Sequence, residues 1–466
     1  MAVRQYIGAR YVTKIYENSL DPSSAEWEQT TYEPLTLVTW QNSSYLSKKE
    51  VPASIGNPAD NPTYWCLTGA YNGQILQLQN DIQRIDNTIE YLPATPEMYG
   101  AAGDGVTDDT QALTEALNDN DCLVLTGTYK ITDMIRLEKN VSLIGLNAKI
   151  LMYGDIDHWF QIVSTNAVVS GISFEKLDSA FTNYNRAFHF YYCDKVYVNN
   201  CSFKNFGTAL HGLHCNYFHV NNVDIIDAYD NVAQYGYGVN TSSHHNFISN
   251  VSGINASDNN GRHLIYLNGD DMVSAEINKI FCKNWNHHPI EINVTNANGC
   301  DVTISDVIFD NVNIDPVGTD KKTGSIHGSD TNLANIYVNN VALKNHTSAV
   351  FDSLGYVKGS ISNVTVQFAT SILVNITDIF VRHSTGFKIT NISAYNRNST
   401  SLALVGCRDS SDVIFDGIYD MTPAETINYL FNIQDSTADI GCYKTSASNV
   451  VRSTGTNTIT ALNYYT

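Results

Sequence analysis

The stretch YGAAGDGVTDDTQALTEAL, residues 99–117, predicts how the main fold of this chain begins. Its three glycines permit tight turns at positive φ, and its three aspartates precede an apolar run that a carboxylate can cap. Ala112, Leu113, Ala116 and Leu117 then recur at helical spacing. The stretch therefore predicts a glycine turn followed by a capped amphipathic helix, in which the aspartates are structural and not catalytic.

A strand pair is expected directly after this helix. Residues 122–132, CLVLTGTYKIT, form the pattern of two short strands joined by a glycine turn. Turn, helix and strand pair together resemble the opening of pectate-lyase-like right-handed β-helix proteins, in which this element closes one end of the helix. The resemblance implies an all-β parallel β-helix for the residues that follow, and it says little about their chemistry.

From about residue 141 onward the chain repeats a unit of two short strands around a polar corner, as in YVNNCSFKN (197–205) and KITNISAYN (388–396). Repeats of 20–35 residues with alternating strands are typical of solenoids. Asparagine suits such corners because it tolerates a left-handed conformation and can bond the backbone of the next repeat. The predicted corner residues, spaced 22 to 34 residues apart, are Asn200, Asn222, Asn250, Lys279, Asp306, Asn340, Asn363, Asn391 and Asp416.

The N-terminal residues 1–70 form the pattern of a separate small β module. Residues 35–38 and 44–46 are predicted strands around an Asn42–Ser43 turn, and the module holds Trp27, Trp40 and Trp65. A module this small needs aromatic residues for its core, which we favour over sugar stacking. The order of its aromatic residues resembles small carbohydrate-binding-like modules near the N-terminus of phage tail proteins. That resemblance implies attachment to the particle or sugar binding.

Residues 71–92 carry the most regular helical pattern of the chain. Their apolar residues recur with the spacing 3-4-3-4-3, which is the seam of a coiled coil, and isoleucine at the core positions favours more than two strands. We therefore expect a trimeric coiled coil and linker over 71–96, a β-helix over 97–425, and a last turn with a C-terminal cap over 426–466. The seam residues are Ile75, Leu78, Ile82, Ile85, Ile89 and Leu92.

Composition limits the partners of this chain. Of its 466 residues 16% are charged, and the net charge of −20 argues against nucleic acid or an anionic membrane as a partner. It also favours a neutral or sparsely charged glycan over a polyanion. The sequence has neither the apolar run of a signal peptide nor that of a membrane span. Nine scattered cysteines without a C-x-x-C pair predict buried free thiols and folding in a reducing cytoplasm.

Candidate site residues concentrate in the middle of the repeats, because ten of the thirteen histidines fall between His189 and His327. Alignment of the repeats on Leu213, Val239, Ile265, Ile290 and Ile326 places the following residue of each strand on the outer face. The predicted outward column is His214, Asn240, Tyr266, Glu291 and His327. The turns beside this column are expected to add Tyr237, Arg262, His263, His288, Asp270 and Asp271.

Two chemistries fit these residues, and the sequence leaves both open. A glycoside hydrolase needs two carboxyl groups, which Glu291 with Asp270 or Asp271 supplies. A polysaccharide lyase needs a base, a group that neutralises the uronate and an acid, roles that suit His263 or His288, Arg262 and Tyr266. The side chains of His214, Tyr237, Asn240, His288 and His327 would then bind substrate. The alternative is polar decoration of the repeats without catalysis. With no zinc-ligand spacing, P-loop or dinucleotide fingerprint, no metal or cofactor is expected.

As a whole, the chain resembles phage tail spike or tail appendage proteins. The resemblance implies a homotrimer in the virion tail, assembled in the host cytoplasm, that contacts other tail proteins through its N-terminal module. It further implies binding, and cleavage, of host surface polysaccharide. A non-catalytic receptor-binding or structural tail protein is the first alternative, and a bacterial polysaccharide lyase is the second.

Overall fold

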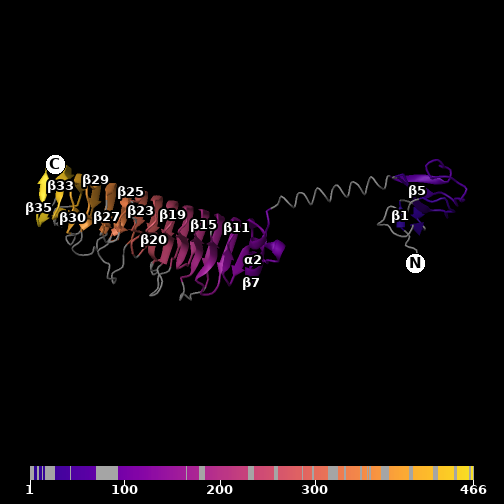
Figure 1. Cartoon of the computed structure of the whole chain (residues 1–466), viewed down its shortest axis with the longest axis horizontal. Helices are drawn as coiled ribbons and strands as arrows, with labels where there is room; N and C mark the ends of the chain where they lie inside the picture. The colour runs from indigo at the N-terminus through magenta and orange to yellow at the C-terminus, as the bar shows by residue number, and fades with distance from the viewer. Residues whose placement is uncertain are drawn as a thin grey trace. The chain divides into compact units, whose positions relative to one another are not determined.

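The computed structural model divides the chain into two compact units, residues 1–92 and 93–466 (Figure 1). The predicted coiled-coil seam at 71–92 lies outside the described residues, so the trimer stays a prediction. The structure describes residues 5–7, 10–12, 14–15, 27–41, 43–69, 93–163, 165–177, 184–228, 236–256, 261–285, 287–295, 299–312, 324–329, 332–346, 349–353, 355, 358–368, 377–397, 402–422, 429–445, 449–460 and 463–464.

The first unit contains a small sheet whose two predicted strands are confirmed. β4 (Thr36–Trp40), β5 (Ser43–Ser47) and β6 (Trp65–Gly69) pair antiparallel, and β3 (Lys14–Ile15) joins β4 in parallel. β1 (Gln5–Ile7) and β2 (Arg10–Val12) form a separate antiparallel pair. The ring of Trp65 is buried 5.2 Å from that of Tyr32, so this tryptophan belongs to the core, as expected.

The second unit begins with the turn, helix and strand pair predicted from the opening stretch. The elements are η1 (Pro96–Tyr99), β7 (Asp104–Asp108), α2 (Thr110–Asp119), β8 (Cys122–Leu125) and β9 (Thr128–Ile131). Gly100, Gly103 and Gly105 all adopt positive φ, and the apolar face of α2 packs into the core through fully buried side chains. The predicted helix and strands are therefore confirmed.

Of the aspartates expected to cap the helix, Asp108 accepts from its first amide, that of Thr110, at 3.1 Å, whereas Asp109 has a different role. The helix starts directly after Asp109, but its carboxylate accepts hydrogen bonds from the N–H groups of Ala102 (2.7 Å) and Gly103 (3.3 Å) instead of from the helix. The backbone of Asp109 (φ −97°, ψ 7°) departs from the extended conformation in which a capping side chain reaches the first helical amides. Asp109 thus ties the glycine turn to the start of the helix.

The rest of the unit is a solenoid in which each turn adds one strand to each of two parallel sheets (Figure 1). This confirms the parallel solenoid, whereas its handedness stays a prediction. The short-strand sheet consists of β10 (Ile135–Leu137), β12 (His158–Val163), β14 (Arg186–Tyr191), β16 (Thr208–Leu213), β18 (Gly236–Thr241), β20 (Gly261–Gly269), β22 (Ile290–Val294), β24 (Gly324–Gly328), β26 (Ala349–Ser353), β28 (Thr377–Arg382), β30 (Ala403–Arg408), β32 (Tyr429–Gln434) and β35 (Asn449–Thr454).

The long-strand sheet carries the corners. The central strands are β11 (Val141–Met152), β13 (Ala167–Lys176), β15 (Lys195–Lys204), β17 (Tyr217–Ile226), β19 (His245–Ile254), β21 (Ser274–Lys283), β23 (Asp301–Asp310), β25 (Asn335–His346), β27 (Gly359–Phe368), β29 (Lys388–Tyr395) and β31 (Val413–Asp420). The stack ends with β33 (Thr437–Ile440), β34 (Cys442–Lys444), β36 (Thr458–Thr460) and β37 (Asn463–Tyr464), which continue the parallel pairing.

The predicted corners are left-handed residues within these long strands. Eight of the nine, from Asn200 to Asn391, adopt φ between 51° and 57°. At the ninth turn the left-handed residue is Gly417 and not Asp416, because Thr390 pairs with Asp416 and Ile392 with Ile418. Several corner side chains bond a side chain of the preceding turn, as where Asn222 Nδ2 donates to Asn200 Oδ1 at 2.6 Å. The expected bond to the backbone of the next turn is made by Asp416, which accepts from the N–H of Cys442 at 2.8 Å.

The solenoid core is apolar, and a group of charged side chains is also buried near its C-terminal end. Arg397 donates from Nε to Asp378 (3.1 Å) and from Nη1 to Asp420 (2.5 Å), and all three side chains are fully buried. All nine cysteines are free, as the sequence predicts, and six of them are buried, whereas Cys66 and Cys442 are half-buried and Cys122 is exposed. Within the described ranges, no helix is long and apolar enough to span a membrane.

Candidate functional site

The pairing of the strands shows that the predicted outward column was wrong at its first residue, His214. His211, and not His214, pairs with Asn240, because Leu210 is the partner of Val239. The remaining partners follow as predicted: Asn240 with Tyr266, Tyr266 with Glu291, and Glu291 with His327. The column, hereafter the site column, extends in both directions beyond the prediction and comprises His189, His211, Asn240, Tyr266, Glu291, His327 and Asp352.

Side chains of the site column lie on the outer face of the short-strand sheet. The preceding residues Leu210, Val239, Ile265 and Ile290 are fully buried in the core, and side chains alternate faces along a strand. Adjacent members of the column are therefore about 4.8 Å apart along the stack.

A second column, the flanking column, runs beside the first and contains Tyr237, His263 and His288. The ring centroids of Tyr237 and His263 are 5.4 Å apart, and those of His263 and His288 are 5.5 Å apart. Tyr266 of the site column stacks against both Tyr237 (5.2 Å) and His263 (5.3 Å). The structure thus brings the predicted tyrosines and histidines together into one aromatic surface.

Backbone carbonyls fix the orientation of the two flanking histidines. His263 Nδ1 lies 2.8 Å from the carbonyl oxygen of His288, and His288 Nδ1 lies 3.0 Å from that of Gly324. A carbonyl only accepts, so each Nδ1 carries the hydrogen and each Nε2 of the neutral ring keeps its lone pair. Burial lowers the pKa of both histidines well below its ordinary value, which keeps them neutral near pH 7.

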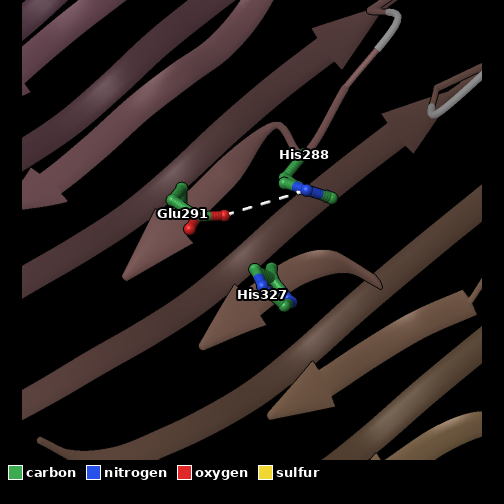
Figure 2. A group of neighbouring side chains, drawn as sticks. All are labelled: His288, Glu291 and His327. Atoms are coloured by element: carbon green, nitrogen blue, oxygen red, sulfur yellow. Dashed lines mark ion pairs between the residues drawn. The ribbon is translucent and has the colours of Figure 1, made fainter. Parts of the chain in front are cut away.

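Glu291 lies where the two columns meet. Its Oε2 is 3.9 Å from Nε2 of His288, and His327 approaches from the next strand (Figure 2). The rings of His288 and His327 are 4.7 Å apart. Glu291 is 9% exposed and each histidine 5%, so this is a largely desolvated cluster of one carboxylate and two imidazoles.

The structure does not bring the other predicted carboxylates to Glu291. Asp271 Oδ2 instead contacts His214 Nδ1 (2.9 Å) and His244 Nε2 (3.4 Å) in the turn after β20. Asp270 is exposed in the same turn, and Arg262 is half-buried at the start of β20, next to His263 in the sequence. The predicted pair of Glu291 with Asp270 or Asp271 is therefore not formed, and a hydrolase site here would need another carboxyl group.

Asp352 is a site-column carboxyl that sequence reasoning missed. It lies two strands beyond Glu291, is 2% exposed, and has Arg382 Nη2 3.7 Å from its Oδ1. Burial raises its pKa to about 7, although Arg382 acts in the opposite direction. Extending the alignment by one repeat would have found Asp352, since Phe351–Asp352 repeats the apolar–polar step of Ile326–His327.

His189 and His211 were also missed, and they extend the site column toward the N-terminal end. Their rings stack at 4.8 Å, and His158 contacts His189 edge-on at 4.3 Å. Burial lowers the pKa of His189 to about 3 and that of His211 well below its ordinary value. These rings are therefore neutral and add polar aromatic surface, not positive charge.

Comparison with known proteins finds likeness in structure only. No known family model matches the sequence, and no curated protein matches it either. Tailspike protein 3 of bacteriophage CBA120 is 12% identical, with 93% of this chain and 76% of that one covered at a TM-score of 0.49. The Streptococcus pneumoniae surface adhesin PfbA is 13% identical (78% and 100% covered, TM-score 0.44).

A third solved structure, the catalytic unit of the GH87 α-1,3-glucanase from Streptomyces thermodiastaticus, is also 13% identical (81% and 70% covered, TM-score 0.41). At these identities and TM-scores the three structures resemble this chain in fold only. The solenoid itself follows from the strand pairing of this chain.

Proposed function

We propose that this chain is a phage tail spike or appendage that binds a host surface polysaccharide along the site column and hydrolyses it. The observation that carries the proposal is the presence of an aromatic surface and two carboxyl groups in one column on one face of the solenoid. The tail assignment rests on the sequence, with its N-terminal module, seam at 71–92 and solenoid in that order. Homotrimerisation and attachment through residues 1–70 belong to the same proposal.

Binding is assigned to the N-terminal side of the column. Tyr266 and Tyr237 are half-buried and stack on each other, with the buried ring of His263 packed against both, so the two tyrosines form an aromatic surface with polar edges. Such surfaces suit the apolar faces of sugar rings. Several strands of about 4.8 Å spacing match the length of a few sugar units. The net charge of −20 favours a neutral or sparsely charged glycan.

Hydrolysis is assigned to Glu291 and Asp352. Two strand spacings separate their backbone positions by about 10 Å, near the ~6.5–9.5 Å between the carboxyl groups of inverting glycosidases. Asp352 gives its proton to the glycosidic oxygen as the bond from that oxygen to the sugar carbon breaks. Glu291 takes a proton from the water whose oxygen forms the new bond to that carbon. The anomeric configuration is therefore inverted.

The proposal is tested on purified bacterial capsular and O-antigen polysaccharides, with reducing ends, product masses and anomeric NMR signals as readouts. Glu291→Gln and Asp352→Asn should each lower the cleavage rate at least 100-fold, the scale of a lost general acid or base. Glu276→Gln is the matched control, because Glu276 is exposed on β21 of the other sheet.

Three outcomes contradict parts of the proposal. Glycan binding without cleavage by the wild type would favour the non-catalytic receptor-binding alternative. An unsaturated uronate in the products would favour the lyase chemistry of His263, Arg262 and Tyr266. Retention of the wild-type rate by Asp352→Asn would remove Asp352 from the catalytic pair.

A further inference from the structure

Three side chains at the centre of the site column have the composition of a metal site. His288 lies two residues before β22, Glu291 is the second residue of β22, and His327 lies on the adjacent β24. One ligand atom from each lies within 4.8 Å of the others, and Figure 2 shows the three groups around one small space. The cluster has no sequence motif, because the third group enters from the next turn of the solenoid, 36 residues after Glu291.

A second contact prepares His288 for this role. Its Nδ1 hydrogen is donated to the carbonyl oxygen of Gly324, so the lone pair of Nε2 faces the carboxylate of Glu291, 3.9 Å away. Metal-binding histidines in proteins usually donate their other ring N–H to a carbonyl or carboxylate, which fixes tautomer and ring direction. The ring is thus oriented by a group outside the cluster.

The donor set selects the kind of ion. Two imidazoles and one carboxylate are a common ligand set for Zn²⁺ with an open fourth position, whereas Ca²⁺ and Mg²⁺ prefer oxygen ligands. Bonds of about 2.0–2.1 Å in tetrahedral geometry place ligand atoms roughly 3.3 Å apart. The Nε2–Oε2 pair, 3.9 Å apart, therefore needs to close by about 0.6 Å, and the widest pair of the cluster, at most 4.8 Å apart, by up to about 1.5 Å.

We propose that His288, Glu291 and His327 bind one divalent transition-metal ion of the Zn²⁺ type, with water as its fourth ligand. The ion offsets the cost of holding the Glu291 carboxylate in a desolvated cluster. A further consequence rests on the proposed function. A bound ion would hold the Glu291 carboxylate as a ligand and lower its basicity toward water, so we expect metal binding and glycan hydrolysis to exclude each other.

Zn²⁺ titration of the metal-free, full-length protein by calorimetry tests the site directly. We expect one ion per chain, and at least tenfold weaker binding in both His288→Gln and His327→Gln. His219→Gln is the matched control and should bind as the wild type does, because His219 lies on β17 in the other sheet. Ca²⁺ and Mg²⁺ should give no comparable binding.

Two further readouts protect the test against loss of folding. Co²⁺ should give the visible absorption of a tetrahedral site in the wild type and in His219→Gln, and this absorption should be lost in a His327→Gln protein that keeps its circular dichroism spectrum. Zn²⁺ should raise the midpoint of thermal unfolding of the wild type and of His219→Gln, and it should leave that of His288→Gln and His327→Gln unchanged. No Zn²⁺ binding, or binding that both site variants leave unchanged, would overturn the proposal.

The mutual exclusion of Zn²⁺ binding and hydrolysis is tested separately, with a polysaccharide that the wild type cleaves. Zn²⁺ should reduce hydrolysis by the wild type, and a chelator should restore it. A rate increase with Zn²⁺ would overturn the exclusion while leaving the ion site in place. If no polysaccharide is cleaved with or without Zn²⁺, the proposed hydrolysis fails, and calorimetry still decides the metal site.

Discussion

The carboxylate of Asp109 holds the backbone N–H of Ala102 at 2.7 Å, across the glycine turn that opens the solenoid. Asp109 is 1% exposed and also accepts from Gly103, so one buried side chain fixes the turn against the first helix. The role of this aspartate is to close one end of the stack, away from the site column.

Replacing Asp109 by alanine should destabilise the protein without affecting its site. Asp109→Ala removes two charge-assisted hydrogen bonds and should cost about 1–3 kcal/mol of unfolding free energy in chemical denaturation. Asp104→Ala should cost less, because the carboxylate of Asp104 is exposed and bonds only within its own turn. Loss of glycan cleavage at unchanged stability would instead make Asp109 a functional residue.

Asp352 should make stability fall as pH rises. Its folded pKa of about 7 lies above the unfolded value near 3.8, so the folded state keeps a proton that the unfolded chain releases. Stability conferred by that proton is complete below about pH 4 and is lost as pH rises toward 7, up to about 4 kcal/mol.

The measurement is the difference in unfolding free energy between the wild type and Asp352→Asn from pH 4 to pH 8. The wild type should lose stability relative to this variant as pH rises, while the exposed control Asp119→Asn should follow the wild type. Parallel curves for wild type and Asp352→Asn would show that Asp352 titrates normally.

Arg397 should be the most sensitive charged residue for folding. Arg397→Met removes the cation between the fully buried Asp378 and Asp420 and should cost about 3–5 kcal/mol, because two buried carboxylates lose the positive charge that they share. Arg408→Met is the matched control at an exposed arginine and should change the unfolding free energy by less than about 1 kcal/mol. Equal effects of the two changes would argue against a structural role for the buried group.

The seam at 71–92 predicts the oligomeric state. Light scattering of the purified chain should give about three times its mass of 51.6 kDa. Replacing Ile82 and Ile85 together by asparagine should weaken this trimer, and replacing the polar Gln83 and Asn87 by alanine should not. A monomer of the unmodified chain at micromolar concentration would rule out the predicted trimer.

The sequence predicted the stacking of this chain because its corners have a strong local preference. Asparagine adopts the left-handed conformation easily, and eight of the predicted corner residues, most of them asparagines, are left-handed. The ninth failed by one residue because Gly417, next to Asp416, adopts the same conformation without a side-chain penalty. Local preference thus located each turn but could not choose between two suitable neighbours.

Long-range register decided the parts of the site that sequence could not predict. His211 and His214 are three positions apart, and both follow a leucine, so either could be aligned with Asn240. Only the pairing of Leu210 with Val239 resolves the choice. Glu291, Tyr266 and His327 were placed correctly because the apolar residues before them, Ile290, Ile265 and Ile326, left no such ambiguity.

Insertions in this solenoid are confined to particular connections, a property with consequences for evolution. The connection from β15 to β16 has three residues and that from β23 to β24 has thirteen, yet both pairs of strands keep the regular register of the stack. A connection can therefore be lengthened or exchanged without shifting the ladder of corner side chains. The fold thus separates a conserved stacking pattern from segments that can be exchanged one connection at a time.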